Sequence, residues 1–295
     1  MKISHILDIN LIAKKISFET RKKNEKIRHY LGKYNPNLIV FDGGLGSQIM
    51  NYFQFTYLIH NNYKVELNME YFDNPSSEHH NFFVLRKWAL DRYGISIDSI
   101  KNKAYKISNN NAKIPSNLLA KDDKNYFKKF LDLDLSDIFP IDTLKLNEFL
   151  FNNNISSDYY AIHIRKGDAL NVASKLVTEN DVHDLSLKLF IKLPKHPILI
   201  FSDSEIDGIV KNTLIKLGYT DVHIFLPGSC SDFTVHDLLR GAKILVTSNS
   251  TFSLSAALLS RKTQLAFIPM EFYSGYRDGP SNELINKLSK FSMLS

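Results

Sequence analysis

The second half of the chain alternates short apolar runs with longer helical segments, and this alternation constrains the fold more than any other feature of the 295 residues. Strands and helices that alternate at this pitch form right-handed βαβ units, whose strands pair in a parallel sheet. The predicted strands cover residues 159–164, 198–201, 222–225, 244–246 and 265–268. The predicted helices cover residues 181–193, 205–217 and 251–259, with others beginning near residues 231 and 281. The fold class is therefore α/β.

The first half repeats this pattern less regularly. Strands are predicted at residues 38–41, 64–68 and 104–107, and helical patterns at residues 49–60, 82–93 and 113–150. Asn152–Asn153–Asn154 has the composition of a linker, so we place a domain boundary there. The predicted division is a helical extension over residues 1–36, an α/β domain over residues 37–153 and a second α/β domain over residues 154–295.

Composition narrows the function classes. The net charge of +6 is spread along the chain and forms no basic stripe interleaved with aromatic residues, which argues against nucleic-acid binding. Cys230 is the single cysteine, so an intrachain disulfide and a multi-cysteine zinc site are excluded. We find no apolar run of about 18 residues and no signal peptide, and expect a cytoplasmic protein. The cations between residues 14 and 28 have two interpretations. They form either a solvated helix face or a surface for peripheral contact with the inner face of the membrane.

A glycine-rich turn follows the first predicted strand. It reads Asp42–Gly43–Gly44–Leu45–Gly46–Ser47–Gln48 and leads into a long apolar helix. This order brings free backbone N–H groups to the positive end of a helix dipole, which favours an anion or a closely packed sugar. The turn lacks the third glycine of G-x-G-x-x-G and the Lys-Ser/Thr of a P-loop. Close packing of the helix on the strand explains the glycines equally well.

Polar clusters follow three strands of the second half. They are His163, Arg165 and Asp168, then Ser202–Asp203–Ser204, then residues 247–251. The carboxyl ends of adjacent parallel strands lie at one edge of a sheet, so these clusters should converge there. An arginine fork and hydroxyls at a helix start suit a diphosphate. The alternatives are an Arg165–Asp168 ion pair that closes a turn, and helix capping by Ser250 and Asp203.

Taken in order, four stretches resemble the signature motifs of the α-1,2-fucosyltransferases of glycosyltransferase family 11, across residues 38–270. They are residues 42–48, 163–168, 201–204 and 248–253. The resemblance implies a GT-B-like architecture of two facing Rossmann-type domains with parallel sheets. It also implies inverting transfer of L-fucose from GDP-β-L-fucose, with no metal or other cofactor. The expected acceptor is a glycan, free or lipid-linked, used in cell-surface polysaccharide synthesis, and its attacking group is expected to be the 2-OH of a galactose.

The resemblance also implies roles for individual residues. Arg165 is expected on the β-phosphate with His163 close to the nucleotide, and Asp203 near guanine or ribose. Ser250, Thr251 and Phe252 are expected at the phosphates, and Gly43, Gly44, Gly46 and Ser47 at the donor. Arg165 is the main catalytic candidate. A carboxylate or a histidine in the cleft is needed to accept the acceptor's proton, and Asp42, which is placed to face the cleft, is a candidate for this general base.

Two positions depart from the family pattern, and other functions therefore stay open. Ser47 stands where family members usually carry asparagine, and Lys166 where a second arginine is frequent. The alternatives are transfer of a different sugar from GDP or a related nucleotide, and a non-catalytic nucleotide- or glycan-binding module. A metal-dependent transferase would need a carboxylate pair at a strand end. Asp132 and Asp134 fall in helical sequence, and residues 78–80 lack a partner motif, so we expect no metal.

Overall fold

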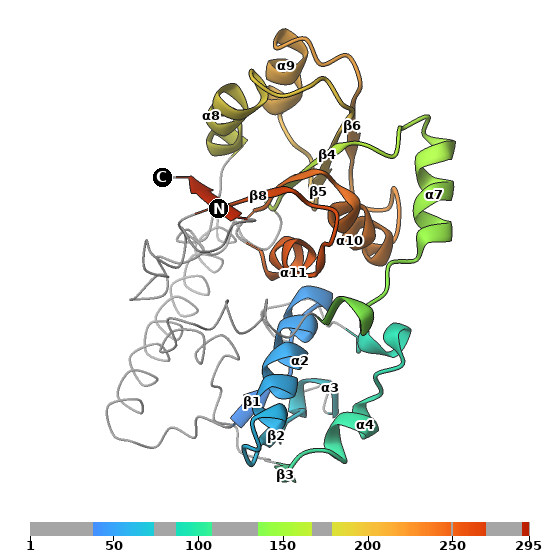
Figure 1. Cartoon of the computed structure of the whole chain (residues 1–295), viewed down its shortest axis with the longest axis vertical. Coiled ribbons are helices and arrows are strands. Elements are labelled where there is room, and N and C mark those ends of the chain that lie inside the picture. Colours follow the sequence, from blue (N-terminus) through green and yellow to red (C-terminus); the bar gives the residue numbers. More distant parts are fainter. Residues whose placement is uncertain are drawn as a thin grey trace, which may run out of the picture.

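The computed structural model of the protein describes residues 38–73, 87–107, 135–166, 179–248, 250–269 and 291–294. These residues form two parallel sheets, with helices packed against them, and α2 and α11 lie between the sheets (Figure 1). The strand orders are β1-β2-β3 and β6-β5-β4-β7-β8-β9, and the strand pairs recorded in both sheets are parallel. This confirms the predicted α/β class with two facing Rossmann-type units. The predicted extension over residues 1–36 lies outside the described residues.

The first sheet contains three short strands and packs on α2. Its elements are β1 (Leu38–Val40), α2 (Leu45–His60), β2 (Glu66–Asn68), α3 (Glu70–Asp73), η2 (Leu90–Tyr93), α4 (Ile97–Lys101) and β3 (Lys106–Ile107). Ile39 and Leu67 are fully buried against Ile49 and Phe53 of α2, which is why the helix lies on the sheet. The helix predicted over residues 82–93 is wrong in its described part, because residues 87–89 are irregular and only the 3-10 turn η2 follows.

Helix α2 begins four residues earlier than predicted. Gly44 is its N-cap and Leu45 its first residue, so Gly46 and Ser47 lie in the first turn of the helix rather than in a loop. The glycine-rich turn is therefore shorter than the sequence indicates, and Asp42 and Gly43 connect β1 directly to the helix start.

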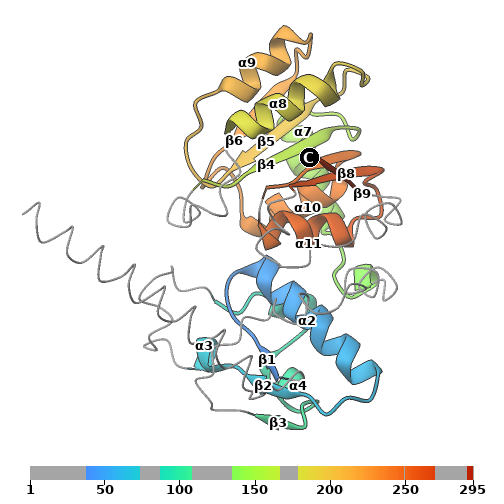
Figure 2. The same cartoon turned by 90° about the vertical axis from the view of Figure 1, so that its left-hand side faces the viewer.

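The second sheet follows the predicted alternation closely. Its elements are β4 (Tyr160–Ile164), α8 (Glu179–Phe190), β5 (Ile198–Ser202), α9 (Ile209–Lys216), β6 (Val222–Phe225), α10 (Asp232–Gly241), β7 (Ile244–Val246), α11 (Thr251–Leu259), β8 (Leu265–Pro269) and β9 (Phe291–Leu294). Helices α8 and α9 share one buried core with the sheet, and α10 and α11 share the other, so the pairs cover opposite faces (Figure 2). Helix α9 starts later than predicted, after Gly208 in a left-handed conformation with φ of 77°. The predicted strands did not include β9.

The chain crosses between the two units through η4 (Leu135–Asp137) and α7 (Thr143–Asn152). Leu135 and Phe139 lie in the core of the first unit, whereas Leu146 and Leu150 of α7 pack in the core of the second. Asp142 caps α7, accepting a hydrogen bond from the Lys145 backbone N–H at 3.2 Å. The boundary at residues 152–154 stays a prediction. Across the described ranges, no helix combines the length and apolar character that a membrane crossing requires.

Candidate functional site

The three polar clusters of the second half converge at one edge of the six-stranded sheet. Strands β5, β4 and β7 are neighbours and run parallel, so their carboxyl ends meet there. Arg165 Nη1 donates to Ser250 Oγ at 3.0 Å, which joins the end of β4 to the start of α11. His163 Nδ1 lies 2.7 Å from Ser248 Oγ. Asp203 Oδ1 accepts from the backbone N–H of Lys166 at 2.7 Å. The predicted convergence is therefore confirmed, while the ligand stays a prediction.

Ser250 both caps α11 and holds the arginine. Its Oγ accepts from the Phe252 backbone N–H at 3.3 Å, as expected of an N-cap, and also accepts from Arg165. Ser250 is 2% exposed, whereas the Arg165 side chain that donates to it is half-buried. Ser250 therefore caps the helix, as the alternative interpretation proposed, and it contacts Arg165 as well. For Asp203 it is wrong, because α9 begins only at Ile209, after a Gly208 cap.

The start of α2 packs directly against the start of α11. A Cβ added to Gly46 would lie 2.4 Å from the Phe252 Cα, closer than real Cβ atoms approach, so glycine is required for this contact. Ser47 Oγ lies 3.1 Å from Thr251 Oγ1 in the same contact. The predicted close packing of the glycine turn is therefore present, but the partner is α11 rather than a strand. It brings the positive ends of two helix dipoles together, beside Arg165.

Gln48 fixes the glycine turn to the rest of the first unit. Its Nε2 donates to the Gly43 and Lys87 carbonyls, each at 2.9 Å, and its Oε1 accepts from the Ala89 N–H at 2.8 Å. Gly43 has φ of 71°, a conformation that glycine adopts without strain. The sequence analysis did not single out Gln48 as a functional residue. Its place four residues after the second glycine of the turn is the local signal that points to it.

His163 supplies a hydrogen bond rather than charge. Burial lowers the pKa of His163 to about 4, Asp203 opposes that shift, and Arg165 adds to it. The imidazole is therefore neutral at pH 7, packed 5.6 Å from the Phe252 ring between centroids. The positive charge beside His163 at this edge comes from the Arg165 guanidinium.

Asp42 ends the connection from β1 and stands beside the start of α2. Burial raises the pKa of this carboxyl to about 6 from 3.8, with the neighbouring Asn51 side chain opposing the shift. A carboxylate with a pKa close to neutrality is suited to accept a proton from a substrate hydroxyl. The predicted partner of Arg165, Asp168, lies outside the described residues.

Arg92 and Asp237 also join the two units, and sequence reasoning missed both. Arg92 Nη2 lies 2.7 Å from Asp237 Oδ2, 145 positions along the chain. No local pattern links residues so far apart in sequence. Within the described ranges, no group of three or more His, Cys, Asp or Glu side chains is arranged to hold a metal. Residues 78–80, Asp132 and Asp134 lie outside those ranges.

Comparisons with known proteins give similarity to solved structures alone. No family model matches the chain, and no curated protein sequence matches it. NodZ α-1,6-fucosyltransferase soaked with GDP-fucose aligns with 76% of this chain and 91% of its own, at 12% identity and a TM-score of 0.40. POFUT1 in complex with GDP aligns with 79% of this chain and 98% of its own, at 11% identity and a TM-score of 0.44. Likeness at this level carries no argument about function, so the proposal below depends on the residues of this chain.

Proposed function

We propose that the protein is an inverting glycosyltransferase that moves L-fucose from GDP-β-L-fucose to a hydroxyl of a glycan acceptor. The observation that carries this proposal is the hydrogen bond from Arg165 to Ser250, beside the joined starts of α2 and α11. An arginine beside the adjacent starts of two helices favours a diphosphate. The motif resemblance supports fucose as the sugar, and the 2-OH of a galactose as the attacking group.

The same groups explain how transfer would proceed. The acceptor oxygen forms a bond to the anomeric carbon while the bond from that carbon to the β-phosphate oxygen breaks, and the negative charge goes to GDP. Arg165 and the helix start at Ser250 stabilise this charge without reorganising, which is the electrostatic contribution expected of such sites. The acceptor proton goes to Asp42, which belongs to the first unit. His163, Asp203, Thr251 and Phe252 bind the nucleotide, and Gly43, Gly44, Gly46 and Ser47 lie at the donor sugar.

The setting of the reaction is part of the proposal. We place the acceptor, free or lipid-linked, against the first unit, because Asp42 lies in that unit, two residues after strand β1. The net charge of +6 suits peripheral contact with an anionic membrane surface from the cytoplasm. The reaction needs no metal in this scheme, since Arg165 supplies the charge that a divalent cation would provide.

Nucleotide binding tests the proposal first. We expect GDP to raise the thermal midpoint in a shift assay, and UDP, CDP and dTDP to raise it less, because the proposed site is specific for guanine. Turnover of GDP-fucose with a galactose-terminated glycan should then persist in EDTA. A shift with another nucleotide in place of GDP would contradict the assignment, and so would GDP binding without transfer to any acceptor.

The pH dependence of transfer tests Asp42. Because the pKa of this carboxyl is raised to about 6, it is ionised above that pH and protonated below it. A protonated base accepts no proton, so kcat should fall as the pH is lowered through about 6. The Asp42→Asn variant should lose this acidic limb from its residual activity. An unchanged limb in Asp42→Asn would assign the titration to another group.

A further inference from the structure

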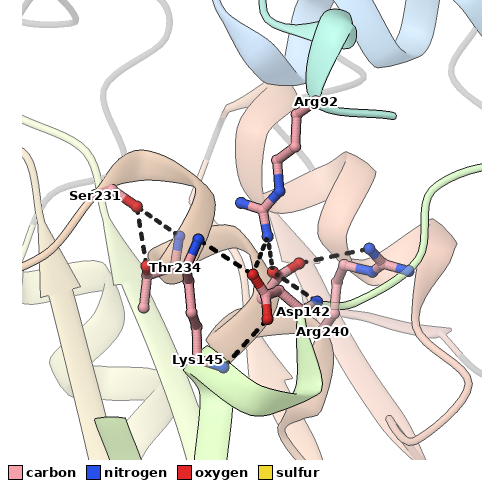
Figure 3. A network of polar contacts seen from close by, with 7 residues as sticks. Arg92, Asp142, Lys145, Ser231, Thr234 and Arg240 are labelled. Atoms are coloured by element: carbon pink, nitrogen blue, oxygen red, sulfur yellow. Dashed lines mark hydrogen bonds and ion pairs between the residues drawn. The ribbon is translucent and has the colours of Figure 1, made fainter. Parts of the chain in front are cut away.

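A buried carboxylate of α10 holds an arginine of the first unit (Figure 3). Asp237 is 2% exposed, and its Oδ2 lies 2.7 Å from Arg92 Nη2. The Arg92 guanidinium also lies 4.7 Å from the ring centroid of Phe233, one turn earlier on α10. Helix α10 therefore binds Arg92 through an ion pair and through an aromatic face.

The same carboxylate oxygen also fixes the chain where it crosses between the units. Asp237 Oδ2 accepts from the Asp142 backbone N–H at 3.2 Å, and the Asp142 carboxylate lies 3.8 Å from Arg92. Arg240 Nη1 is 3.6 Å from the other oxygen of Asp237. Lys145 also lies 3.3 Å from the Asp142 carboxylate, so three cations surround two carboxylates (Figure 3). Asp237 joins η2, α10 and the residue that caps α7.

Short contacts connect each side of this ion pair to the candidate site. On the first unit, Ala89 precedes η2 and donates to Gln48 in the first turns of α2. On the second unit, His236 lies next to Asp237, with its Nε2 3.0 Å from Ser255 Oγ and its ring 5.2 Å from Phe252. Phe252 is the residue of α11 that contacts Gly46 of α2. The contacts therefore form a closed ring: α2, η2, α10, α11 and α2 again.

We infer that Arg92 is a positioning residue, which sets the start of α2 against the start of α11 through its ion pair with Asp237. This inference rests on the proposed transfer function, because it assigns Arg92 a part in that reaction. Buried ion pairs add little net stability compared with apolar replacements, and in some proteins they fix which arrangement of elements is adopted. Displacement of a site by about 1 Å can lower turnover on the order of 100-fold. The pair should thus affect catalysis more than folding.

A triple variant, Arg92→Met/Asp237→Leu/Arg240→Met, tests this role, since it also removes Arg240, the buried arginine that lies 3.6 Å from Asp237. We expect a thermal midpoint close to that of the wild type and nearly unchanged GDP affinity, because Arg165 and Ser250 both lie on the second unit. The kcat should fall at least about 10-fold while the KM for the donor changes little. Arg92→Lys, which keeps a cation beside Asp237, should fold and show an intermediate kcat. Wild-type kcat in either folded variant would overturn the inference.

An exposed ion pair between the units provides the matched control. Arg261 Nη1 lies 2.9 Å from Asp137 Oδ1, with the two side chains 59% and 82% exposed. Arg261→Met/Asp137→Asn should keep wild-type kcat, and an equal loss there would contradict a specific role for Arg92. Hydrogen exchange at residues 45–50 gives a readout independent of activity, and should rise in the Arg92/Asp237/Arg240 triple variant but not in the control. If wild-type protein transfers no sugar, the proposed function fails, and unchanged exchange would separately refute the positioning role.

Discussion

Replacing Arg165 with alanine should lower kcat at least about 100-fold while the protein stays folded. The side chain is half-buried at the end of β4 and donates to Ser250, so its loss removes the cation that we assign to the leaving diphosphate. Ser250 still caps α11 in this variant through the Phe252 N–H, and the helix start is retained. Steady-state kinetics with GDP-fucose would measure kcat, and circular dichroism would measure folding. Calorimetry would measure the affinity for GDP.

Two further variants sharpen the Arg165 experiment. Arg165→Lys keeps the charge but loses the planar fork of donors, so kcat should recover in part. Arg261→Ala removes an exposed arginine of the same unit and should leave kcat unchanged. Activity of Arg165→Ala close to that of the wild type would refute the role of the arginine. Loss of secondary structure in that variant would instead assign Arg165 to folding.

Gly46→Ala should lower kcat on the order of 100-fold and also lower the thermal midpoint. The added Cβ would lie 2.4 Å from the Cα and N of Phe252, and backbone atoms cannot rotate away. Helix α2 or α11 must therefore move, which separates Ser47 from Thr251 and displaces both helix starts from Arg165. Kinetics and thermal unfolding of the purified variant would measure both effects.

Gly94→Ala separates loss of stability from loss of the site. Gly94 has φ of 71°, so alanine there is strained by about 1 kcal/mol, but an added Cβ meets no atom within 4 Å. This variant should unfold at a lower temperature and keep its kcat. If Gly46→Ala and Gly94→Ala lose stability equally and both keep full kcat, the contact between α2 and α11 does not position the site.

The second unit could be predicted from sequence because its signals are local. Apolar runs of three to six residues define its inner strands. The helix at residues 251–259 has the predicted bounds, since Ser250 is a strong N-cap. The meeting of Arg165 with Ser250 was also predictable, because adjacent parallel strands bring their carboxyl ends to one edge. These conclusions need only the order of the strands.

The remaining features of the fold and of the candidate site depend on contacts between segments that are distant in sequence. The sequence indicates a loop at Gly46, because glycine disfavours helices, but the approach of Phe252 makes glycine necessary inside the first turn of α2. The pair of Arg92 with Asp237 depends on how the two units are placed, which no local pattern contains. The alternative role of Asp203 as a helix cap was wrong, because α9 begins after Gly208 rather than after a side-chain cap.

A crystal structure of the protein with GDP tests the central claim most directly. We predict that the diphosphate lies at the edge where β4 and β7 end, with its β-phosphate within hydrogen-bond distance of the Arg165 guanidinium and of the α11 start at Ser250 and Thr251. A diphosphate bound elsewhere, with the Arg165–Ser250 hydrogen bond unchanged and no phosphate oxygen beside it, would contradict the account.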